Sequence, residues 1–456
     1  MPLQKNQVLT LRVERLSSDG SGVAHSPDGE TVFIPGAAPG DEARVRIVKD
    51  CKRYAFGILD EVLTPSPDRI PVDCAVAGPC GGCSLRHLDY AAELRAKQEN
   101  VADAFARIGG LDVPVLPIVG SPEVNRYRNK VQFPVGVDKS GKPCIGFYAG
   151  RTHRIVPCPD CRLQPGVLNE IGNALCAFFA EKGIQPYSEE TGRGLVRHIF
   201  LRRGAHSGQI MVCLVCTRAR LPSAEELCTR LKAQFAEITT ILLNVNAKNT
   251  NVILGTETHT LYGQGYIEDT LCGVPVQLGP LSFYQVNTLA AEQLYGIAAQ
   301  YAQLTQDDLL LDLYCGMGTI GLSMAAHCRE LIGVEIVPEA IESAKANAAR
   351  MGTDVAAKSR FFCADAGQAA TRLAAEGLHP DIVMLDPPRK GCDEATLSAV
   401  VRMSPRRVVY VSCNPATAAR DAAWLEQNGY HAEKVQPVDL FPRTRHCECV
   451  LSLSKV

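Results

Sequence analysis

The stretch Leu309-Leu-Leu-Asp-Leu-Tyr-Cys-Gly-Met-Gly-Thr319 indicates the fold more strongly than any other part of the chain. Its apolar first half is typical of a buried strand, and Gly316 and Gly318 predict a tight turn that opens a helix. Further strand-like segments follow, with helical segments between them, and this alternation predicts a doubly wound, mostly parallel α/β sheet. The strand candidates are 309–313, 330–335, 359–363, 382–385 and 408–412, and the clearest helical segments are 338–351 and 416–427.

The glycine turn is also a candidate nucleoside site. Glycines after the first strand let a ligand approach the backbone closely. Glu335 ends the second strand, and an acid about 20 residues after such a turn can accept hydrogen bonds from ribose hydroxyls. The third glycine of the dinucleotide fingerprint is missing, which favours S-adenosylmethionine (SAM) over NAD. A tight turn without a ligand is the alternative.

Two other strand ends carry candidate reactive groups. Asp386 lies in Leu385-Asp-Pro-Pro-Arg-Lys-Gly391, a stiff loop that should line the reaction pocket beside the nucleoside site. Cys413 lies in Val409-Tyr-Val-Ser-Cys-Asn-Pro415, between an apolar strand and a helical segment. Backbone amides at a helix start can lower the pKa of a thiol, so Cys413 is a candidate nucleophile, against the alternative of an inert core cysteine.

A candidate base lies in Arg443-Thr-Arg-His-Cys-Glu-Cys-Val450. If this segment is a strand, His446 and Glu448 share one face. Flanking cysteines and apolar residues would desolvate Glu448, raise its pKa and suit it to general base catalysis. The alternative is a salt bridge to Arg443 or Arg445.

Composition excludes several classes of protein. The chain has 456 residues, of which 46% are hydrophobic, and a net charge of −2. That apolar content excludes bulk disorder, and no apolar run reaches the roughly 18–20 residues that span a membrane. The first residues lack the apolar core of a signal peptide. We therefore expect a cytoplasmic protein with no membrane association, and nothing points to an obligate protein partner.

Three domains are predicted. Residues 1–63 resemble a small β-barrel, with strand-like segments separated by turns such as 18–22. A proline-rich stretch, 64–71, marks the first boundary. Residues 64–268 form an α+β middle domain, and 269–456 hold the βα repeats. The barrel strands are expected at 8–13, 31–34, 42–48 and 56–62.

Positive charge gathers locally in a chain whose net charge is only −2. Residues 44–53 contain five Lys or Arg and one acidic residue. Residues 126–154 contain seven Lys or Arg and one acidic residue, and residues 193–203 contain four Arg and no acidic residue. Aromatic residues are interleaved in the second and third stretches. These stretches favour RNA backbone contacts, with an ordinary solvated surface as the alternative.

The 19 cysteines form an odd number in a large chain, which argues against a disulfide framework. Three of them cluster as Cys74-x5-Cys80-Gly-Gly-Cys83, and a fourth thiol is available in Cys158-Pro-Asp-Cys161. Four thiolates suit a structural zinc ion or an iron–sulfur cluster, with a group of free thiols as the alternative.

Taken together, these motifs resemble the RNA (uracil-5-)-methyltransferases, and specifically the 23S ribosomal RNA enzymes of the RumA/RlmD type, over essentially the whole chain. The resemblance implies an N-terminal TRAM domain (an OB-like RNA-binding barrel) and a C-terminal Rossmann-like SAM-dependent domain. It also implies that Cys74, Cys80, Cys83 and Cys161 hold a [4Fe–4S] cluster, with Cys158 as the rival to Cys161. The segment 88–122 is expected to leave the middle domain and pack on the catalytic one.

The same resemblance implies roles for individual residues. Ser412-Cys-Asn-Pro415 and His446-x-Glu448 match the nucleophile and base motifs of the family, and Phe283-Tyr-Gln-Val-Asn287 matches its glutamine motif. Thr319 departs from the pattern, because family members commonly have Asn there. The implied SAM pocket comprises Gln285, Tyr314, Gly316, Thr319, Glu335, Asp365 and Asp386.

The implied reaction is methylation of uridine C5. Cys413 adds to C6 of the base, C5 takes the methyl group, and Glu448 removes the C5 proton. Transfer RNA is the alternative substrate, although the simplest transfer-RNA enzymes lack both the barrel and the cysteine cluster. A catalytically silent RNA-binding protein is the alternative of a different class, and the presence of Cys413 and Glu448 argues against it.

Overall fold

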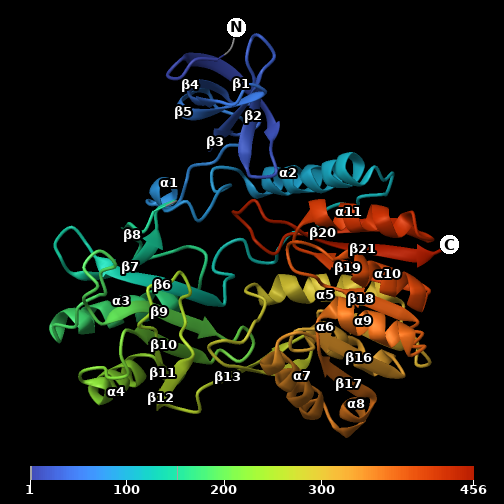
Figure 1. The fold of residues 1–456 in the computed structure, drawn as a ribbon. Coiled ribbons are helices and arrows are strands. Elements are labelled where there is room, and N and C mark those ends of the chain that lie inside the picture. The colour runs from blue at the N-terminus through green and yellow to red at the C-terminus, as the bar shows by residue number, and fades with distance from the viewer. Residues whose placement is uncertain (1–2, 151) are drawn as a thin grey trace.

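The computed structural model describes residues 3–150 and 152–456. Its N-terminal part is a closed barrel with strand order β1-β2-β3-β5-β4, shown in blue in Figure 1. Alternate residues point inward, so Val13, Val32 and Ile47 are buried in a small apolar core. The strands are β1 (Val8–Leu16), β2 (Ser21–His25), β3 (Thr31–Pro35), β4 (Glu42–Asp50) and β5 (Tyr54–Thr64).

β2 corrects the prediction of a turn over 18–22. Ser21 and Gly22 already pair with β3, and only the residues before them form the turn. Gly22 lies against Val13 and Ala37 so closely that a side chain would not fit, which explains a glycine inside a strand.

The middle part is a seven-stranded sheet of order β12-β11-β10-β9-β6-β7-β8, in which only β10 and β11 run parallel. The helices α3 and α4 cover this sheet, and Phe179 of α3 and Leu214 of β10 lie in the core between helices and sheet. The short α1 (Ala77–Cys80) ends at Cys80, one of the predicted cluster ligands. The other elements are β6 (Lys130–Val137), β7 (Pro143–Tyr148), β8 (Ile155–Pro157), α3 (Gly166–Glu181), β9 (Val196–Arg203), β10 (Ile210–Cys216), α4 (Ala224–Gln234), β11 (Ile238–Val245) and β12 (Glu257–Tyr262).

The C-terminal part is the predicted α/β sheet, of order β17-β16-β15-β18-β19-β21-β20. The first five strands are parallel, and β21 lies antiparallel between β19 and β20. All five predicted strands are confirmed: β15 (Leu309–Leu313), β16 (Glu330–Glu335), β17 (Ser359–Cys363), β18 (Ile382–Leu385) and β19 (Arg407–Ser412). β20 (Tyr430–Val438) and β21 (Glu448–Lys455) complete the sheet.

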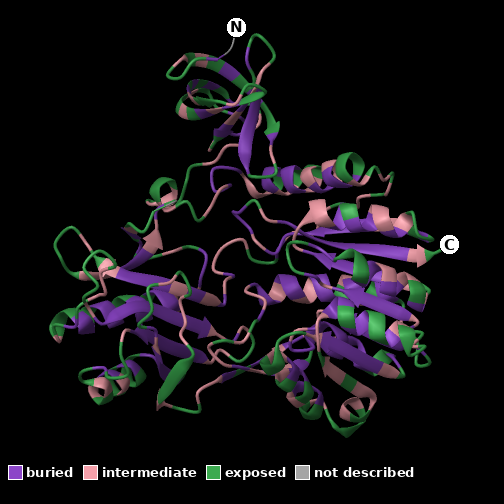
Figure 2. Cartoon of the chain, in the orientation of Figure 1, coloured by how far each residue is buried: buried purple, intermediate pink, exposed green. Residues whose placement is uncertain are grey.

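Helices lie on both faces of this sheet, so its central strands are buried, whereas the edge strand β17 is partly exposed (Figure 2). A hairpin, β13 (Ile267–Leu271) and β14 (Val274–Leu278), packs into the same core. The helical elements are α5 (Thr288–Ala302), α6 (Thr319–Met324), η2 (Ala325–His327), α7 (Pro338–Arg350), α8 (Thr353–Lys358), α9 (Ala366–Ala375), α10 (Glu394–Met403) and α11 (Pro415–Glu426).

The segment 88–122 packs on the C-terminal sheet rather than on the middle one. The helix α2 (Tyr90–Asp103) continues as a π-helical turn, η1 (Ala104–Gly109), which contacts α11 (Figure 1). Phe105 is buried in the core of the C-terminal sheet, and Val115 forms a bridge to Val435 of β20. The predicted boundaries at 63/64 and 268/269 stay predictions.

Among the residues that the structure describes, no helix has both the length and the apolar character needed to cross a bilayer. All 19 cysteines lie in this part of the chain, and every thiol is free.

Candidate active site

The glycine turn after β15 is tied directly to the acid at the end of β16. The amide of Gly316 donates to Glu335 Oε2 at 3.1 Å, and Glu335 Oε1 accepts from the amide of Val337 at 2.9 Å. Tyr314 adopts a left-handed backbone with φ +67°, which is unusual for a side chain of that size and sharpens the turn. Thr319 begins α6 and is buried, with its Oγ1 3.4 Å from the hydroxyl of Tyr295. Asp365 caps α9 by accepting from the amide of Gln368.

Two buried carboxyl groups, those of Asp312 and Asp386, lie near this turn. The sequence analysis assigned no role to Asp312. Asp312 is 1% exposed, and its Oδ2 accepts from the amide of Gly321 at 3.0 Å, which holds the start of α6. Burial raises the pKa of Asp312 to about 8, and burial likewise raises the pKa of Asp386 to about 7. Asp386 is close enough to raise the pKa of Asp312, Cys413 and Glu448 electrostatically. Asp386 therefore connects the expected SAM pocket to the expected reaction centre.

Gln285 lies in an irregular loop that the middle part of the chain holds in place. Asn129 Nδ2 donates to the carbonyl of Gln285 at 2.7 Å and to Thr288 Oγ1 at 3.0 Å. The buried Arg202 donates to the carbonyls of Gly279 and Ser282, at 2.7 Å each. The sequence gives no local sign of these contacts, because they join residues far apart in the chain.

Cys413 directly follows β19 and Glu448 begins the neighbouring strand β21, so the two residues lie at the same end of the sheet. Burial, assisted by the carboxyl groups of Glu448 and Asp386, raises the pKa of Cys413 to about 11. Burial and Asp386 also raise the pKa of Glu448 to about 8, with Arg389 opposing the shift in both groups. The prediction that Glu448 is desolvated is confirmed. The prediction that the helix start lowers the pKa of Cys413 is wrong, because desolvation and two neighbouring carboxyl groups outweigh the backbone amides.

The expected shared strand face is wrong, and the alternative of a salt bridge is not seen. β21 begins at Glu448, so His446 precedes the strand and does not share a strand face with it. Arg443 and Arg445, the alternative salt-bridge partners, donate instead to the carbonyls of Leu88 and Asp19. Arg389, which had no assigned role, is the cation whose charge reaches both Cys413 and Glu448.

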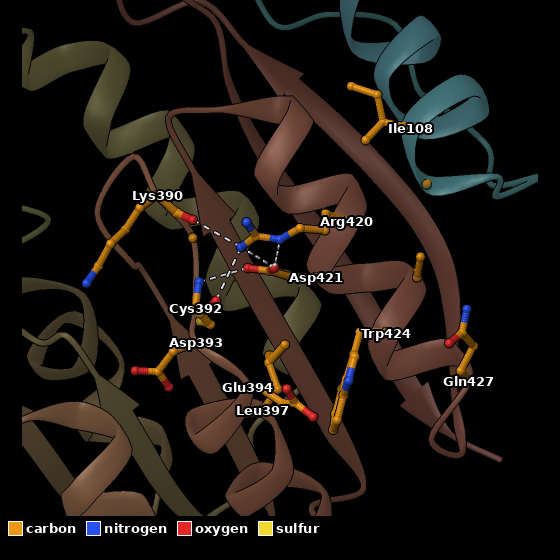
Figure 3. A pocket seen from close by; sticks show the side chains of 13 residues that line it. Ile108, Lys390, Cys392, Asp393, Glu394, Leu397, Arg420, Asp421, Trp424 and Gln427 are labelled. Atoms are coloured by element: carbon orange, nitrogen blue, oxygen red, sulfur yellow. Dashed lines mark hydrogen bonds and ion pairs between the residues drawn. The ribbon is translucent and has the colours of Figure 1, made fainter.

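The loop that carries Asp386 and Arg389 is anchored by α11. Arg420 donates to the carbonyls of Lys390 and Cys392, and Asp421 Oδ2 accepts from the amide of Cys392 at 2.8 Å (Figure 3). A cavity of about 560 Å³ lies beside these contacts, with Trp424 in its wall. The anchor gives the proline loop a fixed position next to Cys413.

The five cysteines of the predicted cluster region line one cavity of about 580 Å³. Cys158 lies beside Cys161, and this neighbour is the main reason that the pKa of Cys161 is lowered. Within residues 3–150 and 152–456, no three Cys, His, Asp or Glu side chains are arranged to hold a metal ion. The thiols share a cavity, and the cluster is not confirmed.

One observation does fit an anionic group in this cavity. Arg86 lines it, is 3% exposed, and donates through Nη1 to Asp73 at 2.7 Å and to Asn125 at 3.0 Å, with its charge acting on the Cys83 thiol. Its Nε and Nη2 have no further hydrogen-bond partner among the described residues. Buried guanidinium donors without a partner are costly, and a thiolate-ligated group with net negative charge would satisfy them.

Two arginines of the third basic stretch differ from their predicted use. Arg197 and Arg202 are buried and donate to backbone carbonyls, so they cannot contact RNA from the surface. Arg44 and Arg46 lie on the barrel surface, paired with Glu61 and Asp60 at 2.7 Å each. The remaining basic residues at the tip between β4 and β5 are exposed, namely Lys49, Lys52 and Arg53. Arg151, in the second stretch, lies outside the described residues.

Comparison with known proteins agrees with this arrangement. A family model described as tRNA (uracil-5-)-methyltransferase matches residues 204–456, and a TRAM domain model matches residues 2–59. An RNA methyltransferase of Halalkalibacterium halodurans is 43% identical over 453 residues, which cover 99% of this chain and 98% of that protein. The chain belongs to the RNA (uracil-5-)-methyltransferases. It is a SAM-dependent RNA methyltransferase with an N-terminal TRAM domain.

Other relatives span the whole methyltransferase as well. An RNA methyltransferase of Oceanobacillus iheyensis is 41% identical over 455 residues, covering 99% of this chain and 98% of its own. The crystal structure of the Pyrococcus abyssi tRNA (uracil-54, C5)-methyltransferase in complex with S-adenosyl-L-homocysteine is similar, with a TM-score of 0.78 and 26% sequence identity. That match covers 98% of this chain and 100% of the Pyrococcus chain.

Proposed function

We propose that this methyltransferase methylates C5 of a uridine in 23S ribosomal RNA, with Cys413 as nucleophile and Glu448 as base. The observation that carries the proposal is the meeting of Cys413 and Glu448 beside Asp386, at the end of the sheet where the glycine turn lies. A thiol and a desolvated carboxyl group are the two groups that this chemistry needs.

Cys413 acts first in the proposed reaction. Its thiolate adds to C6 of the uracil, and the electron pair of the C5–C6 double bond moves toward C5 and the O4 carbonyl. SAM supplies the electrophilic methyl group that C5 then accepts. Glu448, as the carboxylate, takes the proton from C5, and the electrons of that C–H bond re-form C5–C6 and expel Cys413. The thiolate returns to its starting state.

The raised pKa of Glu448 suits its proposed step, whereas Cys413 has to be deprotonated against a raised pKa. A carboxyl group with a pKa near 8 is a stronger base, once ionised, than an ordinary glutamate. Cys413 must lose its proton before it attacks, and Arg389 is the cation that favours its thiolate. The residues proposed to hold SAM are Gln285, Tyr314, Gly316, Thr319, Glu335, Asp365 and Asp386.

We further propose that Cys74, Cys80, Cys83 and Cys161 hold a [4Fe–4S] cluster, which folds the middle part and shapes its RNA surface. Support comes from the shared cavity and from the unpartnered donors of Arg86. Protein purified without oxygen should contain iron and absorb broadly in the visible range, and Cys161→Ser should lower the iron content. Zinc without iron would overturn the cluster assignment. If Cys161→Ser keeps its iron and Cys158→Ser loses it, Cys158 is the fourth ligand in place of Cys161.

The experiment for the main proposal uses labelled SAM with protein-free 23S ribosomal RNA and, separately, bulk transfer RNA. Label should enter 23S RNA, and digestion should return it as 5-methyluridine. Cys413→Ala should abolish transfer, whereas Cys228→Ala, a half-buried cysteine on α4 of the middle part, should not. Undiminished transfer by Cys413→Ala would remove the proposed nucleophile.

Transfer RNA is the second candidate substrate, because the similar solved structure is a tRNA (uracil-54, C5)-methyltransferase. The two substrates are separated by the same assay. Label that enters transfer RNA alone would replace the ribosomal proposal, and no transfer to either RNA would remove both.

A further inference from the structure

A buried group of charges links α2 to the loop that leads into Glu448. We call residues 439–447 the base loop. Lys97 Nζ donates to Asp439 Oδ1 at 2.8 Å, to Glu93 Oε1 at 2.7 Å and to the carbonyl of Phe441 at 3.2 Å. The side chain of Lys97 is 1% exposed and both carboxylates are fully buried. Burial alone disfavours the ammonium, but Asp439 and Glu93 outweigh it and raise the pKa of Lys97 above its ordinary value.

The same helix holds a strained turn in the base loop. Arg443 has φ +67°, in the left-handed region that non-glycine residues rarely adopt. Its amide donates to Glu93 Oε1 at 2.7 Å, and its guanidinium donates to the carbonyl of Leu88 at 2.7 Å. The amide of Leu85 donates back to the carbonyl of Arg443 at 3.1 Å. Residues 85–97 therefore keep the turn in a shape that it would not hold alone.

Other parts of the chain meet the base loop too. Tyr127 of the middle part donates to the carbonyl of Pro442 at 3.0 Å, and Asn287 donates to the carbonyl of Leu440 at 3.0 Å. Arg445 donates to the carbonyl of Asp19 in the barrel at 3.4 Å. Lys97 nevertheless lies at the centre, since it joins the first and third residues of the loop to α2.

We propose that Lys97 is a positioning residue for methyl transfer: together with Glu93 and Asp439 it holds the base loop in the shape that places Glu448 against Cys413. The inference rests on the proposed function, because it takes Glu448 as the base. Glu448 is the first residue of β21, so the path of the base loop sets where its carboxyl group lies. A buried ion pair adds little stability over apolar side chains of similar volume, but it fixes direction.

The test compares Lys97→Met with Arg95→Met, which removes an exposed cation from the same helix. Turnover, RNA affinity, thermal midpoint and the fraction of protein covalently joined to RNA are measured for each. Lys97→Met should lower kcat by about tenfold or more with RNA affinity little changed, and should accumulate the adduct, because a displaced Glu448 removes the C5 proton slowly. Arg95→Met should behave as the wild type.

Asp439→Asn provides a second test in case the Lys97→Met protein does not fold. It keeps the volume of the side chain and an oxygen for Lys97, removes one charge, and should show the same adduct with a smaller loss of kcat. Folded variants with wild-type kcat, or with a lower thermal midpoint and no adduct, would overturn the positioning role. Glu448→Gln in the same assay separates the two proposals. If that variant turns over normally, the base assignment fails, whatever Lys97→Met does.

Discussion

Ser412 pairs with Cys449 across the antiparallel strands β19 and β21. In an antiparallel pair, each step forward on one strand is a step back on the other, so this register sets Cys413 opposite Glu448. The proposed nucleophile and base thus lie next to each other in the fold, although α11 and β20 separate them in the chain. Their mutual position depends on a strand pairing and not on a local motif.

Replacing Glu448 by Gln should trap the enzyme on its RNA. The amide keeps the size of the side chain but cannot take the C5 proton, so turnover should fall by about 10²–10⁴-fold. An RNA–protein adduct that carries the labelled methyl group should appear on a denaturing gel. The double variant Cys413→Ala/Glu448→Gln should form no adduct, and an adduct in that variant would mean that another residue attacks the base.

The rate of methyl transfer should depend on pH through Glu448. Its pKa is about 8, so the carboxylate is a minor form at pH 6 and the major form above pH 8. If proton removal limits turnover, kcat should rise by about tenfold per pH unit up to about pH 7.5 and flatten above pH 8. A pH profile of kcat checks this, and a rate that is independent of pH between 6 and 8 would contradict it.

Glu448 should also make the fold less stable as pH rises. Its pKa is raised in the folded state relative to the ordinary value of 4.5, so the folded protein holds a proton that the unfolded chain releases between about pH 4.5 and 8. Stability from this group is complete below pH 4.5 and is lost as pH rises toward 8. Between pH 5 and pH 8.5, the free energy of unfolding of the wild type should therefore fall by about 1–3 kcal/mol more than that of Glu448→Gln. Denaturant unfolding at the two pH values measures this difference, and an unchanged difference would argue against a raised pKa.

Arg202 should prove structural and not RNA-binding. Arg202→Met leaves the carbonyls of Gly279 and Ser282 without a donor, which should cost about 1–3 kcal/mol of stability and raise KM for SAM through the Gln285 loop. Arg193→Met, at an exposed position of the same basic stretch, should leave both quantities unchanged. Thermal unfolding and SAM titration check the pair, and an Arg202→Met protein with normal stability and weaker RNA binding would reverse the assignment.

The barrel tip should contribute electrostatic RNA binding. Lys52 and Arg53 are exposed there, and replacing both by Ala should lower the slope of log affinity against log salt by about one to two. Arg44→Ala should have less effect, because its guanidinium already pairs with Glu61. RNA titrations at several salt concentrations measure the slopes. Equal slopes for Lys52→Ala/Arg53→Ala and the wild type would place the RNA elsewhere.

The elements with clear local patterns were predictable from sequence. Leu309–Leu313 and the other parallel strands are mostly apolar segments that alternate with helical segments, and the structure confirms them. The pKa of Cys413 was not predictable, since the groups that raise it arrive from β18 and β21. The burial of Arg197 and Arg202 and the role of Lys97 depend on distant partners in the same way. Local pattern indicated which residues are candidates for the reaction, whereas long-range packing decides their protonation and position.

The insertion of β21 between β19 and β20 has a consequence for protein synthesis. Cys413 leaves the ribosome before Glu448, and the space between β19 and β20 stays open until β21 arrives. A chain interrupted between these two residues would carry the thiol without the base, and any uridine that it attacked would stay bound. Because β21 also completes the hydrogen bonding of two strands in the buried core, such a chain should not fold into a form that captures RNA. If Cys413 and Glu448 have the proposed roles, the topology ties the appearance of the nucleophile to the presence of the base that releases it.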